Sequence, residues 1–109
     1  MKANITRSFE TFPGFVYFVK NEESGLIKIG WTGRNVFDRV EEISRASGCE
    51  ILVIGAMYGS KKDEKAIHNA LKSSKDASEW FRQTNEVFEC LVDIFANKPV
   101  VLKAETILA

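Results

Sequence analysis

Short runs of β-branched and aromatic residues dominate the first third of the chain. Two such runs cover residues 14–20 and 26–31, and a polar segment that ends in Gly25 separates them. A short polar connection with glycine near its end is typical of a β-hairpin. A third run, residues 51–58, is apolar almost throughout, which is typical of a strand buried on both faces. The pattern therefore predicts three strands, at 14–20, 26–31 and 51–58.

Apolar residues recur at helical spacing in three further segments, and a capping residue precedes each one. The predicted helices cover residues 36–46, 62–72 and 85–96. In the first helix Val36, Val40 and Ile43 form the apolar stripe, and Arg39 lies on its flank. In the third helix the expected core-facing residues follow the i, i+3, i+4, i+7 rule: Phe88, Leu91, Val92 and Phe95.

Together these elements predict a small α+β domain with a three-stranded, mainly antiparallel sheet flanked by helices. The length of 109 residues suits one domain. Residues 1–12 are expected to be an N-terminal lead-in and residues 13–97 the domain itself. Residues 98–109 are expected to form a tail, and their sequence suits either an extra edge strand or a docking segment.

Composition changes the picture in two respects. The chain carries 15 basic and 15 acidic side chains, so any contact with nucleic acid must come from a local basic surface. The two cysteines, Cys49 and Cys90, are far apart in the sequence and give no zinc pattern with His68. No apolar run is long enough to span a membrane, and no signal peptide is evident. We therefore expect a cytoplasmic protein with reduced thiols.

An ordered set of short motifs runs through the predicted elements. Val16-Tyr17 lies on the first strand, Lys28-Ile29-Gly30 on the second, and Arg39 on the helix that follows. The later motifs are Glu64-x-x-x-His68 and Glu79-Trp80-Phe81. Taken together, the set resembles the GIY-YIG nuclease superfamily, most closely its bacteriophage-type branch, over roughly residues 14 to 95.

This resemblance implies a metal-dependent endonuclease that hydrolyses DNA phosphodiester bonds. Glu64 would be the metal ligand, Tyr17 would act beside the nucleophile, and Arg39 would bind the phosphate. The implied cofactor is Mg²⁺ or Mn²⁺, since a hard cation can bind one carboxylate together with water and substrate oxygens. His68, one helical turn from Glu64, could orient a water molecule or contact the phosphate.

Lys28 is a further candidate catalytic residue. It lies on the strand next to that of Tyr17, and it would lower the pKa of the tyrosine if the register placed the two side chains opposite each other. Lys61, Lys62 and Lys65 form a basic run that, with Arg39, suits a DNA backbone. The resemblance thus implies DNA as the partner, and a further protein could supply specificity.

Structural explanations exist for the same residues. Glu64 and His68 could be a surface pair, Lys28 could be an edge-strand lysine that discourages aggregation, and Tyr17 could be a core aromatic. Phe15 stands where the GIY-YIG motif has glycine, and Lys28 stands where it has tyrosine. These departures favour an alternative, a catalytically decayed module that binds nucleic acid or a protein partner. A third hypothesis is an interaction domain that dimerises through residues 100–109.

Overall fold

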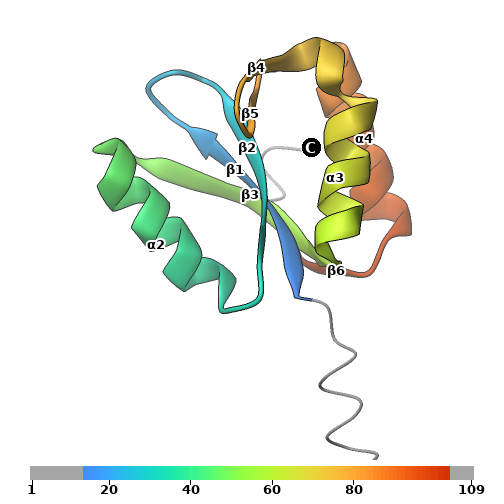
Figure 1. Cartoon of the computed structure of the whole chain (residues 1–109), viewed down its shortest axis with the longest axis horizontal. Helices are drawn as coiled ribbons and strands as arrows, with labels where there is room; N and C mark the ends of the chain where they lie inside the picture. Colours follow the sequence, from blue (N-terminus) through green and yellow to red (C-terminus); the bar gives the residue numbers. More distant parts are fainter. Residues whose placement is uncertain (1–13, 104–109) are drawn as a thin grey trace, which may run out of the picture.

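A computed structural model describes residues 14–103 of the chain. In this range an antiparallel sheet forms the middle layer, with α2 on one face and α3 and α4 on the other (Figure 1). The strand order is β4-β5-β2-β1-β3-β6, so β1 lies inside the sheet between β2 and β3. The position of β1 explains why the apolar run near the start of the chain is buried on both faces.

The sheet has long central strands and short outer ones. The central strands are β1 (Phe15–Asn21), β2 (Ile27–Thr32) and β3 (Ile51–Tyr58). The outer strands are β4 (Lys75–Ala77), β5 (Trp80–Phe81) and β6 (Val100–Lys103). All their pairings are antiparallel.

Each α-helix begins at a capping residue that the sequence identifies. The helices are α2 (Val36–Ser47), α3 (Lys61–Ala70) and α4 (Asn85–Asn97), and a short 3₁₀ helix covers Lys72–Ser74. Asn35 and Thr84 accept backbone hydrogen bonds from the first turns of α2 and α4, and Ser60 with Asp63 forms a capping box on α3. Gly48 ends α2 with φ 68, a left-handed conformation that glycine adopts without strain.

Alternate residues of the central strands feed two separate hydrophobic clusters. Tyr17 and Val19 face α2 and pack with its stripe of Val36, Val40 and Ile43. Val16 and Phe18 face the other side and pack beneath α3 and α4. Directly paired residues on adjacent strands point to the same face of a sheet. The β2 residues that pair with Tyr17 and Val19 therefore also face α2.

The expectation of a three-stranded sheet is wrong, because the described residues form six strands. The three predicted strands are present, at nearly the predicted bounds. The missed strands β4 and β5 have three and two residues, too few to show a period-2 pattern. Residues 100–103 form the edge strand β6, whereas residues 104–109 and the predicted lead-in 1–12 lie outside the described residues.

The predicted core face of α4 is also wrong in part. Leu91 and Phe95 are buried as expected, but the other buried residues are Val87 and Ile94. Phe88 is 50% exposed. Because α4 carries apolar residues over more than half of its circumference, its pattern alone does not decide which stripe faces the sheet.

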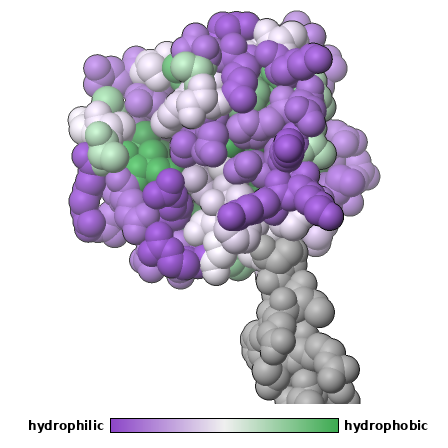
Figure 2. All heavy atoms as spheres, in the orientation of Figure 1, coloured by the Kyte–Doolittle hydropathy of each residue, from purple (hydrophilic) through white to green (hydrophobic). Residues whose placement is uncertain are grey.

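Hydrophilic side chains cover most of the molecular face seen in Figure 2, and hydrophobic residues appear there only in small patches. The exposed large hydrophobic residues among the described ones are Phe37, Tyr58, Phe88, Val92 and Val101. Within residues 14–103, no helix is both long enough and apolar enough to cross a membrane.

Candidate functional site

Tyr17 lies at the centre of the sheet and is fully buried. Its partners across the two adjacent strands are small residues, Gly30 on β2 and Ala56 on β3. A Cβ atom added to Gly30 would lie 2.3 Å from the Tyr17 hydroxyl oxygen and 2.4 Å from Cζ. The phenol therefore lies directly over Gly30, and the glycine is required at this position because any side chain would displace the tyrosine.

The Tyr17 hydroxyl is a buried polar group that has no hydrogen-bond partner among the described residues. Burial raises its pKa, and the carboxylates of Glu79 and Glu64 act in the same direction. The Arg39 guanidinium opposes this rise, although its position does not meet the geometry of a hydrogen bond. With its pKa raised, Tyr17 is a neutral phenol near pH 7 that can donate a hydrogen bond.

Lys28 does not meet Tyr17 directly, as the sequence hypothesis required, because its partner on β1 is Val19. Its Nζ atom lies 2.9 Å from Oε1 of Glu79 and 5.4 Å from the centroid of the Trp80 ring. Only 13% of the Lys28 side chain is exposed. The explanation as an edge-strand lysine also fails, since β5 pairs outside β2 and places Trp80 opposite Lys28.

Arg39 extends from α2 toward the same region. Its Nη1 atom donates to Oε1 of Glu42 at 3.0 Å, and Arg34 donates to both oxygens of that carboxylate at 3.0 Å. Arg34, and after it Arg39, lowers the pKa of Glu42. Arg39 and Lys28 line a surface pocket of about 290 Å³ together with Trp80.

Glu64 approaches from α3, on the opposite side of the sheet from α2. Its carboxylate is partly buried, and the described residues provide no hydrogen bond or ion pair to it. Burial raises its pKa, as does the nearby carboxylate of Glu79, against opposing effects of His68, Lys28 and Lys61. Glu64 and Glu79 both influence the pKa of Tyr17, so the three groups share one electrostatic environment.

His68 lies one turn from Glu64 but has a different environment. Its Nε2–H donates to the backbone carbonyl of Ile29 at 2.7 Å, and its ring meets Phe81 edge-to-face at 4.9 Å. A carbonyl oxygen can only accept, so Nε2 carries the proton. In this structure His68 fastens α3 to β2 next to Gly30, which is a positioning role.

The basic run lies at the start of α3. Lys61, Lys62 and Lys65 are exposed, and Nζ of Lys61 lies 5.0 Å from the centroid of the Trp31 ring. Lys61 also lies close enough to Glu64 to influence its pKa. The exposed lysines therefore flank the side of the site from which Glu64 approaches.

The site residues provide one carboxylate suited to a divalent cation. No group of three or more His, Cys, Asp or Glu side chains able to hold a metal ion occurs within residues 14–103. Glu79 is engaged by Lys28, which leaves Glu64 as the carboxylate of the site without an ion pair among the described residues. A hard cation that retains water and takes the remaining oxygens from substrate fits such a site, and its charge would offset the burial that raises the Glu64 pKa.

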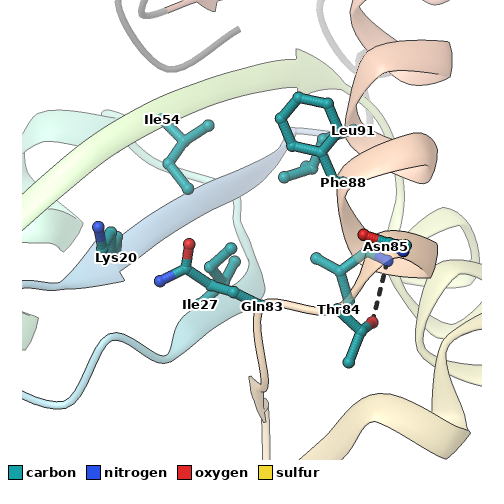
Figure 3. Close-up of a pocket in the computed structure, with 9 residues that line it drawn as sticks. Lys20, Ile27, Ile54, Gln83, Thr84, Asn85, Phe88 and Leu91 are labelled. Carbon is teal, nitrogen blue, oxygen red and sulfur yellow. Dashed lines mark hydrogen bonds between the residues drawn. The ribbon is translucent and has the colours of Figure 1, made fainter.

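A larger pocket lies on the other face of the sheet and shares no residue with the pocket at Arg39. It has a volume of about 420 Å³ and lies between α4 and the sheet (Figure 3). Phe88 and Leu91 of α4 face Ile54 and Ile27 of the sheet across it, with Lys20 at one end. The charged groups around Tyr17 do not line this larger pocket.

Two residues of the site had no assigned catalytic or binding role in the sequence analysis. Glu79 and Trp80 formed part of a motif, but nothing in the sequence indicated that β5 would place them beside Lys28. A two-residue strand leaves no periodic signal, and its pairing spans about fifty residues of chain. The only sequence feature that could have indicated a functional role for this motif was its composition, an acidic residue next to an aromatic one.

Comparison with known proteins corrects the family resemblance. A model of the T5orf172 domain matches residues 14–96, and no GIY-YIG family model matches. Both families are phage-associated and nuclease-like, and the short motifs did not distinguish them. No curated protein and no solved structure matches the chain.

Proposed function

Because this chain belongs to the T5orf172 domain family, a nuclease-like and DNA-binding family, we propose that it is a metal-dependent endonuclease that hydrolyses DNA phosphodiester bonds. The proposal depends mainly on one observation. The Tyr17 hydroxyl, which has no hydrogen-bond partner within residues 14–103, lies within electrostatic reach of Arg39 from α2 and Glu64 from α3. A hydrolase of phosphodiesters needs this combination of a proton-handling group, a cation and a carboxylate in one place.

The side chains take distinct roles in this proposal. Arg39 releases Glu42 and presents its planar guanidinium to two phosphate oxygens. Lys28 adds a second positive charge from β2, on the sheet face that carries Tyr17. Tyr17 donates a hydrogen bond to an oxygen of the reacting group, or it takes a proton from the attacking water as it passes its own to the leaving oxygen, so that the neutral phenol is restored.

Glu64 would hold Mg²⁺ or Mn²⁺. When bound, the cation supplies charge neutralisation at the phosphate and makes a coordinated water more acidic. His68 keeps α3 against β2, so that Glu64 stays within electrostatic reach of the phenol. The lysines at the start of α3 bind the DNA backbone beside the reacting phosphate, which Arg39 holds.

The test is cleavage of supercoiled plasmid with Mg²⁺ or Mn²⁺ and with chelator. Glu64→Gln should lower the rate by roughly 100-fold or more, the scale observed when a charge-stabilising group is removed. Glu89→Gln, at an exposed position of α4, is the matched control and should cut as the wild type does. Equal cleavage by Glu64→Gln and the wild type would refute the site assignment.

A second candidate function is DNA binding without cleavage. Arg39 is already paired with Glu42, and Lys28 with Glu79. Ion pairing of this kind is also expected in a site that has lost its catalytic activity. A protein that binds DNA in chelator but leaves plasmid intact with either metal would favour this function over the first.

A further inference from the structure

The pocket beside Arg39 and Lys28 has walls that the proposed hydrolysis does not use. Ile43 and Ala46 of α2 and the indole of Trp80 on β5 form its apolar part. Glu42 and Ser47 add polar atoms from α2. The pocket therefore combines one apolar wall with charged and polar side chains, as a site for a polar, partly aromatic group would.

The size and chemistry of this pocket suit one nucleobase. Its volume of about 290 Å³ lies just below the range of roughly 300 to 1,000 Å³ that is usual for pockets that hold drug-sized ligands. An aromatic wall offers a stacking surface to any base, and the carboxylate and hydroxyl can bond to a base edge. Lys28 and Arg39, which line the pocket, are also the residues proposed to bind the phosphate. A base in the pocket would therefore lie next to its own phosphate.

In the structure, Lys28 lies over the Trp80 ring, and its Nζ atom is 5.4 Å from the ring centroid. The ammonium therefore occupies a position above the indole that a base could also take. A phosphate held at Arg39 would compete with Glu79 for the Lys28 ammonium, and movement of the ammonium toward that phosphate would free the ring for the base. Bases in a duplex are already stacked and paired, so only an unpaired base can enter.

We propose that this pocket holds one unpaired nucleobase of a DNA strand, stacked on Trp80, next to the phosphate bound by Arg39. The inference rests on the proposed DNA-cleaving function and specifies its substrate. The substrate is single-stranded or locally unpaired DNA rather than continuous duplex.

Two variants remove the base site in different ways. Trp80→Leu keeps apolar bulk against the α2 cluster but removes the aromatic face. Ala46→Leu fills the pocket from an exposed helical position and leaves the core untouched. Ala70→Leu makes the same change at an exposed position of α3 that lines neither described pocket, and it is the control.

The measurement is binding of a labelled short single-stranded oligonucleotide and of the matching duplex, in chelator so that no cleavage occurs. We expect the wild type to bind the single strand more tightly. Trp80→Leu and Ala46→Leu should each weaken that binding by about 5- to 150-fold, the range for removal of one stacked base, with duplex binding unchanged. Ala70→Leu should behave as the wild type does, and Trp80→Phe, which keeps an aromatic face, should bind single strands more tightly than Trp80→Leu does.

Single abasic nucleotides placed along the strand give an independent check. One position should weaken wild-type binding but have no further effect on Trp80→Leu, because both changes remove the same contact. The inference is overturned if Ala46→Leu binds single strands as the wild type does, or if the wild type prefers the duplex. Since no metal is present, a failure here is distinct from a failure to cut plasmid, which would refute only the cleavage.

Discussion

Two residues of the site occupy environments that disfavour them. Tyr17 has a fully buried hydroxyl without a partner among the described residues, and Glu64 has a carboxylate whose pKa burial raises. Neither arrangement stabilises the fold, because an unsatisfied buried polar group and a desolvated charge both cost free energy. Such costs are typical of residues retained for function.

Tyr17→Phe should separate function from stability. It removes a hydroxyl that no group in the described part of the chain bonds, and it keeps the ring over Gly30, so the free energy of unfolding in urea should stay equal or rise by up to about 1 kcal/mol. Plasmid cleavage should fall by about 100-fold, the lower part of the range for removal of an acid–base group. Tyr58→Phe, which changes the other tyrosine of the chain, should cut normally. Full activity in Tyr17→Phe would exclude the hydroxyl from the chemistry.

The raised pKa of Glu64 predicts a pH-dependent stability. The native state holds this proton up to a higher pH than the unfolded chain does, so the free energy of unfolding decreases as pH rises from about 4.5, the ordinary value, through the raised pKa. Glu64→Gln lacks this decrease and should be more stable than the wild type above that window. Urea titrations between about pH 4 and 8 measure the difference.

Added Mg²⁺ should make the wild type more stable than Glu64→Gln, because the cation binds and stabilises only the native wild type. A variant whose stability follows the wild type at every pH, with and without Mg²⁺, would contradict both the proton and the metal assignment.

At the scale of elements, the pairing of β1 with β2 positions the site. The register places Tyr17 opposite Gly30, and the pairing of β2 with β5 covers Ile27 and Lys28 but not Gly30. The capping box sets the start of α3, and the bond from His68 to Ile29 holds that helix against the same stretch of β2. Elements on both faces of the sheet thus meet at one short stretch of strand.

Gly30→Ala tests this arrangement. The new Cβ would overlap the phenol of Tyr17, so the variant should lose about 1–3 kcal/mol of unfolding free energy and much of its cleavage activity. Gly33→Ala is the control, because its nearest neighbour is a Trp31 ring atom at 3.2 Å, where a small shift suffices. Equal stability of the two variants would show that the tyrosine is not confined by the glycine.

At the scale of the whole molecule, the formal net charge is +0, so affinity for DNA must come from locally clustered basic side chains. In the proposed function, that local surface consists of Arg39 and the exposed lysines at the start of α3. A neutral protein gains little from long-range attraction, so each direct phosphate contact should account for a large share of the binding.

Replacing Lys61, Lys62 and Lys65 with alanine should make DNA binding less dependent on salt. The slope of log affinity against log salt concentration should shrink by roughly 0.9 for each lysine that bound a phosphate, and α3 should persist because alanine favours helix. Alanine at Lys72 and Lys75, beyond the other end of α3, should change the slope less per lysine. Equal effects per lysine would mean that binding follows total charge rather than this surface.

The amino-acid sequence by itself determined the central elements. Long apolar runs, capping residues and glycine positions are local signals, and they placed β1, β2, β3 and the three described α-helices within a few residues. The sequence also predicted the buried face of α2, Val36, Val40 and Ile43, because these apolar residues recur at helical spacing on a single face. The ordered motifs pointed to a nuclease-like, DNA-binding family, but they were too short to select the T5orf172 domain.

Only the tertiary structure decided the rest. The strands β4, β5 and β6 are too short to carry a period, and the face of α4 that packs depends on the surface it meets. Register decided that Tyr17 faces Gly30 rather than Lys28, because sliding a pair of strands changes every cross-strand neighbour without changing the sequence pattern. The pocket at Trp80 exists because a two-residue strand pairs with a strand about fifty residues away, and such a non-local contact leaves no local signal in the chain.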